Sequence, residues 1–134
     1  MAKKLSRKSL IKKLDTIFSQ YIRLKSADEK GYVSCYTCGI KKYWEKDYMQ
    51  NGHFISRRHM ILRYSEKNCR PQCYGCNVRG GGKQYQFSIN LNKEYGYNIA
   101  EKLLHESRKT AKFSTDELIS LINRYEEFVK LMKI

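Results

Sequence analysis

The sequence contains two C-x-x-C pairs, Cys35 with Cys38 and Cys73 with Cys76. Each pair can form a knuckle whose thiolates point at one ion, and two knuckles give a closed tetrahedral site of the kind that holds structural zinc. A thioredoxin-like redox pair would need a βαβ context that the sequence lacks, and an iron–sulfur cluster is the other alternative. The spacing therefore favours a structural Zn2+ ion held by these four cysteines, with Cys69 left over as a buried or partly buried free thiol.

Polar residues within and just after the segment between the knuckles could support hydrolysis of a phosphodiester bond. His53, Asn68 and Asn77 follow one another with 14 and 8 residues between them. Such hydrolysis needs a base to activate water, a divalent cation to stabilise the transition state and a residue that orients the base. A neutral imidazole serves as a base near neutral pH, and an asparagine can pin a loop through its amide donor and acceptor. The order of residues resembles that of HNH, or ββα-metal, nucleases, in which a zinc-knuckle pair often braces the finger.

A longer string of residues resembles one narrower family. It comprises C-Y-T-C-G, G-H-F-I-S-R-R, L-R-Y-x-x-x-N-C-x-P-Q-C-Y-G-C-N and G-G, and the resemblance covers roughly residues 15–96. The family is the NinG/Rap group of lambdoid phages, which are recombination endonucleases that act on branched DNA. The resemblance implies a zinc-stabilised, HNH-like nuclease that uses a divalent metal to cleave D-loops and Holliday-type junctions.

The resemblance also implies a role for each matched residue. By it, the four cysteines bind zinc, His53 is the general base, Asn68 orients the loop and Asn77 is a ligand of the catalytic cation. Asparagine rather than histidine in the third HNH position favours Mg2+ or Mn2+ over a softer ion. Gly52 stands where many HNH enzymes place a metal-binding aspartate, so the match supplies no acidic ligand at this position.

Basic residues near these positions are candidate DNA contacts. Arg57 and Arg58 follow His53 by four and five residues, where two guanidinium groups could clamp a phosphate. Arg79 and Lys83 flank the three glycines at 80–82, whose backbone amides could approach a phosphate that a Cβ would obstruct. The alternatives are that the arginines are solvated surface charges and that the glycines form a hinge into the following helix.

The charge of the chain indicates a polyanionic partner. The formal net charge is +14, and residues 1–90 carry 19 basic and 6 acidic side chains against 8 and 7 in residues 91–134. An excess confined to one part of the chain favours contact with nucleic acid over a basic surface kept only for solubility. No apolar run is long enough to span a bilayer, and the N-terminus lacks the apolar core of a signal peptide. We therefore expect no membrane partner and a cytoplasmic location, which the phage resemblance places in a bacterial host cell.

Hydrophobic periodicity predicts helices at both ends of the chain. The predicted helices cover about 5–27, 84–95, 98–107 and the residues from Ser114 onward, where S-T-D-E forms a capping box with Glu117. Gly96 should end the second of these helices as an αL cap. The broad apolar face of the last helix predicts either core packing or a subunit interface.

The segment between the helices should be a small module that needs a metal to hold it together. Residues 32–82 have short strand-like runs, the only proline and six of the eight glycines. The predicted fold class is α+β, mainly helical, in one compact domain. A zinc-stapled, HNH-like ββα-metal module over 31–96 is flanked by a basic N-terminal helix over 1–30 and C-terminal helices over 97–134.

Together these features predict a metal-dependent, structure-specific DNA endonuclease that hydrolyses phosphodiester bonds in branched recombination intermediates. The expected partners are junction DNA, a second copy of the chain and other recombination proteins. Two alternatives remain open at the level of sequence. One is a non-catalytic, zinc-stabilised DNA-binding accessory of recombination, and the other is a sequence-specific HNH homing or nicking endonuclease.

Overall fold

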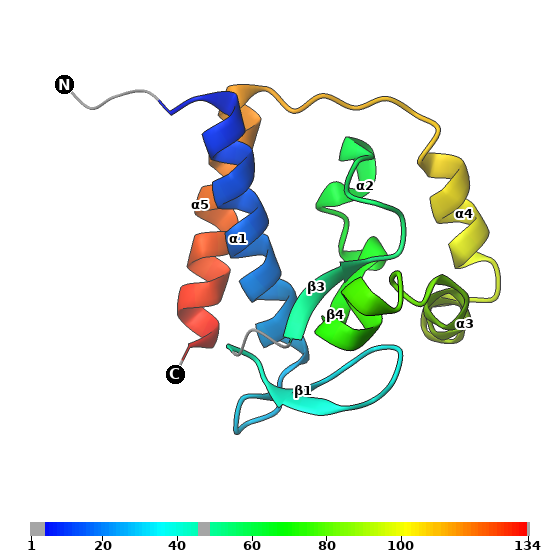
Figure 1. Cartoon of the computed structure of the whole chain (residues 1–134). Coiled ribbons are helices and arrows are strands. Elements are labelled where there is room, and N and C mark those ends of the chain that lie inside the picture. Colours follow the sequence, from blue (N-terminus) through cyan, green and yellow to red (C-terminus); the bar gives the residue numbers. More distant parts are fainter. Residues whose placement is uncertain (1–4, 46–48, 134) are drawn as a thin grey trace.

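The computed structural model describes residues 5–45 and 49–133 and has the mixed α+β fold that the sequence predicts (Figure 1). The helical elements are α1 (Arg7–Ser26), α2 (Met60–Arg63), η1 (Glu66–Asn68), η2 (Gly75–Arg79), α3 (Gln84–Tyr95), α4 (Ile99–Glu106) and α5 (Thr115–Met132). The strands are β1 (Tyr32–Ser34), β2 (Lys41–Tyr43), β3 (Met49–His53) and β4 (Cys69–Cys73), which form two antiparallel pairs. Within the described residues, none of the helices is long and apolar enough to cross a membrane.

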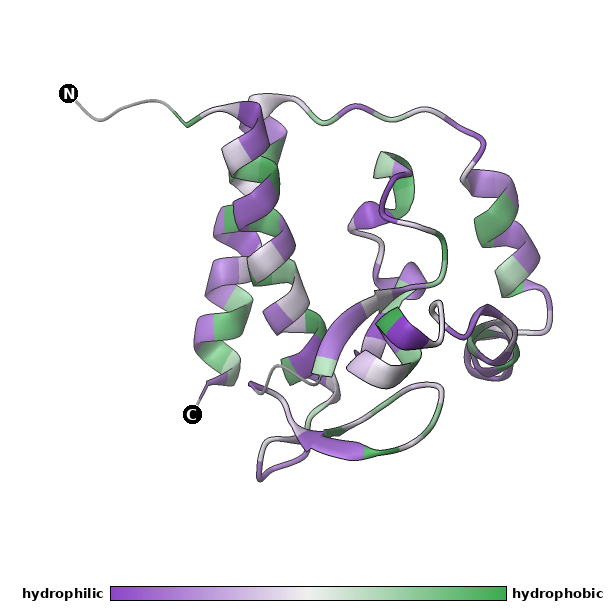
Figure 2. Cartoon of the chain, in the orientation of Figure 1, coloured by the Kyte–Doolittle hydropathy of each residue, from purple (hydrophilic) through white to green (hydrophobic). Residues whose placement is uncertain are grey.

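Helices α1 and α5 lie side by side and bury their apolar faces against each other (Figures 1 and 2). The Ser6 hydroxyl caps the first turn of α1, and the predicted capping box of Ser114 and Glu117 begins α5. Aromatic rings fill the space between the two helices, with the Phe18 and Tyr125 centroids 5.0 Å apart and nearly edge to face. Most of the apolar face of α5 therefore packs in the core of the chain, while Ile119 and Leu131 on the same helix stay exposed.

The β3–β4 pair places His53 at the end of one strand, opposite Cys69 at the start of the other. All five residues of β4 are buried, although the sequence did not predict a strand around Pro71. Proline is tolerated there because β4 belongs to a sheet of only two strands. The Pro71 carbonyl, on which the ring has no effect, accepts a hydrogen bond from the Tyr36 amide at 2.8 Å. This bond ties β4 to the first cysteine knuckle.

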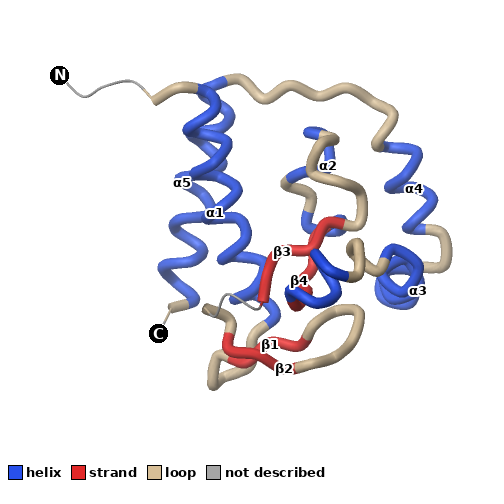
Figure 3. The backbone as a smooth tube through the Cα atoms, viewed as in Figure 1, coloured by secondary structure: helices blue, strands red, loops and turns tan. Residues whose placement is uncertain are grey.

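The β3–β4 pair lies between the α1–α5 pair and the helices α3 and α4, and the β1–β2 pair lies near the end of α1 (Figure 3). Helices α3 and α4 pack through Phe87, Leu91 and Leu103, which are almost fully buried. Gly96 does end α3, but its φ of 121° and ψ of 150° are not those of an αL cap, so that prediction was wrong. Its amide still donates to the Asn92 carbonyl, and the extended ψ turns the chain directly into α4.

Candidate functional site

The four cysteines of the two C-x-x-C pairs come together in one cluster. Their sulfur atoms all lie within 4.8 Å of one another, and the Sγ atoms of Cys38 and Cys73 are 3.7 Å apart. Four thiolates held tetrahedrally about 2.3 Å from a zinc ion would lie about 3.8 Å from each other. The cluster therefore fits a structural metal such as zinc. Cys69 is fully buried and stands outside this group, as expected for a free thiol.

Hydrogen bonds stabilise the thiolate forms of the cysteines, which are the forms that bind a cation. Burial opposes ionisation of Cys35, but bonds from the Cys73 backbone, the Thr37 hydroxyl and the Cys38 backbone lower its pKa to about 6. A backbone hydrogen bond from Ile40 favours the thiolate of Cys38, yet burial and the three neighbouring thiols raise its pKa to about 12. Thiolates this close repel one another, so the cluster can ionise fully only around a positive ion.

A cleft of about 760 Å³ opens beside the β3–β4 pair. Helix α1 forms one wall, and residues of the β3–α2 loop, the glycine run and α4 form the others. The residues on which the site depends are Asp15, Gln50, His53, Arg57, His59, Arg63, Asn77, Gly81 and Gly82. The structure thus brings two of the three predicted catalytic residues, His53 and Asn77, to the lining of one cavity.

His53 is partly buried at the end of β3, and its Nε2 atom lies 3.0 Å from the carbonyl oxygen of Arg63. A carbonyl oxygen can only accept a hydrogen bond, so Nε2 must carry the proton and Nδ1 keeps the lone pair of the neutral ring. Burial lowers the pKa of His53 below its ordinary value, although the bond to Arg63 and the charge of Asp15 oppose the shift. The ring is therefore neutral at pH 7, which is the form that a general base requires.

Asn68 does not line the cleft; it lies behind it with no exposed surface. Its Oδ1 accepts from the Ile55 amide at 2.8 Å, and its Nδ2 donates to the carbonyls of Ile55 and Leu62 at 3.0 and 3.2 Å. One side chain thus joins the start of the loop after β3 to helix α2. This geometry suits the loop-orienting role that the resemblance implies for Asn68.

Asn77 lies in η2, immediately after the second cysteine knuckle, and is half-buried. Its Nδ2 donates to Oε1 of Gln50 on β3 at 2.8 Å. That bond directs the amide nitrogen at the sheet, so Oδ1 is the atom of this side chain that could bind a hard cation.

The structure explains why no acidic residue precedes His53. Gly52 packs directly under the fully buried Gln72 side chain, and a Cβ at position 52 would lie 2.7 Å from Gln72 Cδ. Gln72 is itself held by donating from Nε2 to Thr37 Oγ1 and to the Gly82 carbonyl, at 3.1 and 2.9 Å. Any side chain at position 52 would therefore displace a residue that connects the first knuckle to the glycine run.

The predicted DNA contacts divide between the cleft and the surface around it. Arg57 lines the cleft and is largely exposed, with Nη1 3.9 Å from the Asp15 carboxylate. Arg58, Arg79 and Lys83 are also exposed, but in the part of the chain that the structure describes they lie outside the lining of this cavity. Positive φ angles occur at Gly81, Gly82 and Lys83, so the glycine run is a tight turn, and its two last glycines face the cleft.

Two charged residues of the cleft were missed at the level of sequence. Asp15 on α1 accepts from the Arg63 guanidinium through both carboxylate oxygens, with Nε 2.9 Å from Oδ1. The hydroxyl of Tyr64 donates to the same Oδ1 at 2.9 Å. The string L-R-Y contained Arg63 and Tyr64 without a role, and Asp15 follows the buried Leu14 on an otherwise basic helix. The sequence signal for Asp15 was that it is an isolated acidic residue beside the apolar face of a basic helix.

Comparison with known proteins gives a match to one family model. No curated protein and no solved structure matches the chain at a significant level. The family model described as bacteriophage lambda NinG protein matches residues 1–134, which is the whole chain. This match extends well beyond the segment that carries the sequence resemblance. The chain therefore belongs to the NinG family of phage recombination-associated proteins.

Proposed function

We propose that this protein is an HNH-type endonuclease that uses Mg2+ or Mn2+ to cut branched DNA. One observation carries the proposal. The ring of His53 is held neutral, with its proton on Nε2, at the edge of a cleft that Asn77 also lines. A non-catalytic DNA-binding protein would have no need of a partly buried, oriented imidazole in a cavity that an asparagine side chain also lines.

In the proposed reaction, His53 Nδ1 accepts a proton from the water that attacks the scissile phosphate. Arg57, exposed at the same cleft, binds the phosphate and aligns it with that water. Asn77 Oδ1 would hold the divalent cation, which stabilises the charge that develops on the phosphate and the leaving oxygen. A zinc ion held by the four clustered cysteines would have no open position, so it would brace the module and take no part in the chemistry.

The choice of branched DNA rests on the family and on charge. NinG proteins are associated with phage recombination, whose intermediates are D-loops and four-way junctions. The excess of basic residues in positions 1–90 supplies a sequence-independent attraction to the phosphate backbone. Such attraction favours recognition of DNA shape over sequence. We place the reaction in the cytoplasm of the host bacterium.

The test is a panel of labelled DNAs of matched sequence: linear duplex, flap, D-loop and four-way junction. Each is incubated with zinc-loaded protein and Mg2+, Mn2+ or EDTA, and is run on denaturing and native gels. We expect cleavage of the branched DNAs only with a divalent cation. A shifted native band without products in any cation would instead identify a DNA-binding accessory. Faster cutting of one linear sequence would identify a sequence-specific nicking enzyme.

A further inference from the structure

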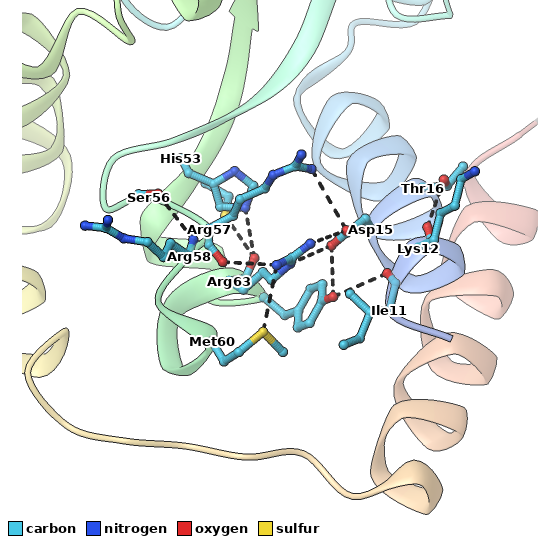
Figure 4. Close-up of polar contacts among 12 residues, drawn as sticks. Ile11, Lys12, Asp15, Thr16, His53, Ser56, Arg57, Arg58, Met60 and Arg63 are labelled. Atoms are coloured by element: carbon cyan, nitrogen blue, oxygen red, sulfur yellow. Dashed lines mark hydrogen bonds and ion pairs between the residues drawn. The ribbon is translucent and has the colours of Figure 1, made fainter. Parts of the chain in front are cut away.

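A charged cluster outside the proposed catalytic set connects α1 to the loop that holds His53. Asp15 and the Arg63 guanidinium form a two-point ion pair in which both side chains are mostly buried, with 23% and 17% of their surface exposed. Figure 4 shows the pair between α1 and the segment that contains His53, Arg57 and Arg63. Two parallel hydrogen bonds fix the orientation of a guanidinium far more tightly than one contact does.

The backbone of Arg63 is the link to His53. Its carbonyl oxygen accepts from His53 Nε2 at 3.0 Å, and the Cys69 thiol donates to the same oxygen at 3.7 Å. The direction of this carbonyl therefore decides which nitrogen of the imidazole is protonated. The neighbouring carbonyl, that of Leu62, is already held by Asn68.

Two anchors thus fix the end of α2. Asn68 holds it by donating to the Leu62 backbone carbonyl, and Asp15 on α1 holds it by accepting from the Arg63 side chain. Arg63 Nη1 also donates to the Arg57 carbonyl at 3.2 Å, which extends the same bracing to the loop that carries the exposed phosphate contact. Helix α1, which contributes no catalytic residue, thus reaches the carbonyl beside the proposed base through Asp15 and Arg63, and Tyr64 donates to the same carboxylate.

The charges around His53 also indicate that Arg63 needs Asp15 as a partner. The Arg63 and Arg57 guanidinium groups lower the pKa of His53, and the Asp15 carboxylate opposes them. An Arg63 side chain without Asp15 would be an uncompensated, mostly buried cation, which is unstable and would turn toward solvent or phosphate. Its backbone would move with it.

We propose that Asp15 and Arg63 are positioning residues that fix the tautomer and orientation of His53. The inference rests on the proposed function for its catalytic consequence, but not for its structural one. In the intact pair, Nε2–H points at the Arg63 carbonyl and Nδ1 is the only basic nitrogen. When the pair is broken, the Arg63 carbonyl loses one of its two anchors and becomes less fixed in direction, so the ring samples both tautomers and the lone pair is no longer presented at one place.

The first measurement needs no activity. In the zinc-loaded, 15N-histidine-labelled full chain at pH 7.5, the ring nitrogen shifts of His53 should report a single tautomer protonated at Nε2. Asp15→Asn and Arg63→Gln should each move these shifts toward a mixture of tautomers. Glu126→Gln is the matched control, because it removes an exposed ion pair, Lys13 with Glu126, that joins α1 to a different helix, α5. Unchanged His53 shifts in both test variants would overturn the proposal.

The second measurement is cleavage of a four-way junction under single-turnover conditions. A misplaced base costs on the order of 100-fold in rate, while junction affinity should stay within about twofold. The double variant Asp15→Asn with Arg63→Gln should lose no more than either single variant, because the two residues act as one unit. Additive losses would mean that Asp15 acts independently of Arg63, against the proposal.

Folding and function can be separated in the same experiment. If Asp15→Asn does not fold, Arg63→Lys provides the test, since it keeps the charge but cannot donate through two nitrogens of one plane. Mixed tautomers in that variant support the proposal, and a single Nε2–H tautomer with full cleavage contradicts it. If the unsubstituted protein cuts no DNA, the proposed function fails, but the nitrogen shifts still decide whether the pair sets the tautomer.

Discussion

Replacement of Asn68 by alanine should destabilise the protein by about 2–4 kcal/mol. The side chain is fully buried and makes hydrogen bonds to the Ile55 amide, the Ile55 carbonyl and the Leu62 carbonyl. The Leu62 carbonyl also accepts from the Ser65 amide, so it keeps a partner in the variant. The two backbone groups of Ile55 lose the bonds that Asn68 provides, and an unpaired buried group costs about 1–3 kcal/mol. Taking the lower part of that range, because water can enter the space left by the amide, gives the predicted total.

The assay is urea unfolding of the zinc-loaded protein, followed by tryptophan fluorescence and by far-UV circular dichroism. Asn77→Ala is the control, because that half-buried amide makes one side-chain hydrogen bond within the described residues, to Gln50, and its loss should cost less than about 1 kcal/mol. Coincident transitions in the two probes are required for the comparison. A loss below about 1 kcal/mol for Asn68→Ala, or equal losses for the two variants, would refute the account of Asn68 as the residue that holds the loop.

Three further predictions follow from the site. Burial lowers the pKa of His53, so the base is lost to protonation below the ordinary histidine range, and the fall in rate toward low pH should have its midpoint below about pH 6.5. A midpoint at or above about pH 6.5 would contradict this. Metal analysis should find one zinc ion per chain, and this ion should protect the four clustered cysteines from alkylation. Buried Cys69 should react only after the protein unfolds, whether zinc is bound or not. A fold that stays stable after complete chelation of zinc would argue that the ion does not brace the module. Gly52→Asp should destabilise the fold by about 1–3 kcal/mol through its clash with Gln72 and should be partly rescued by Gln72→Gly; a gain in stability or in affinity for Mg2+ would show that the acid fits as a ligand.

Much of the architecture follows from local rules in the sequence. The helix boundaries of α1 and α5 are set by the Ser6 and Ser114 caps and by apolar periodicity, which need no knowledge of the rest of the chain. The cysteine cluster follows from spacing alone, because each C-x-x-C pair brings two sulfurs together and all four ligands are cysteine thiolates. These features are encoded over a few residues each.

Features that depend on contacts between distant segments were harder to predict. Strand β4 contains Pro71, and its status as a strand depends on pairing with β3 and on the Tyr36 amide, 35 residues earlier. The Asp15–Arg63 pair joins residues 48 apart, and neither is in a metal-ligand or base motif. The conformation of Gly96 is set by where α4 must begin, so the choice between an αL cap and an extended turn was not encoded in the helix itself.

The central claim is that His53 is the base of a metal-dependent nuclease, and the most direct test is single-turnover cleavage of a four-way junction by His53→Ala. His105→Ala, which changes an exposed histidine on α4, is the matched control. We predict a loss of at least about 100-fold in cleavage for His53→Ala, with junction binding and zinc content unchanged, and no effect for His105→Ala. Cleavage by His53→Ala at the rate of the unsubstituted protein would contradict the account.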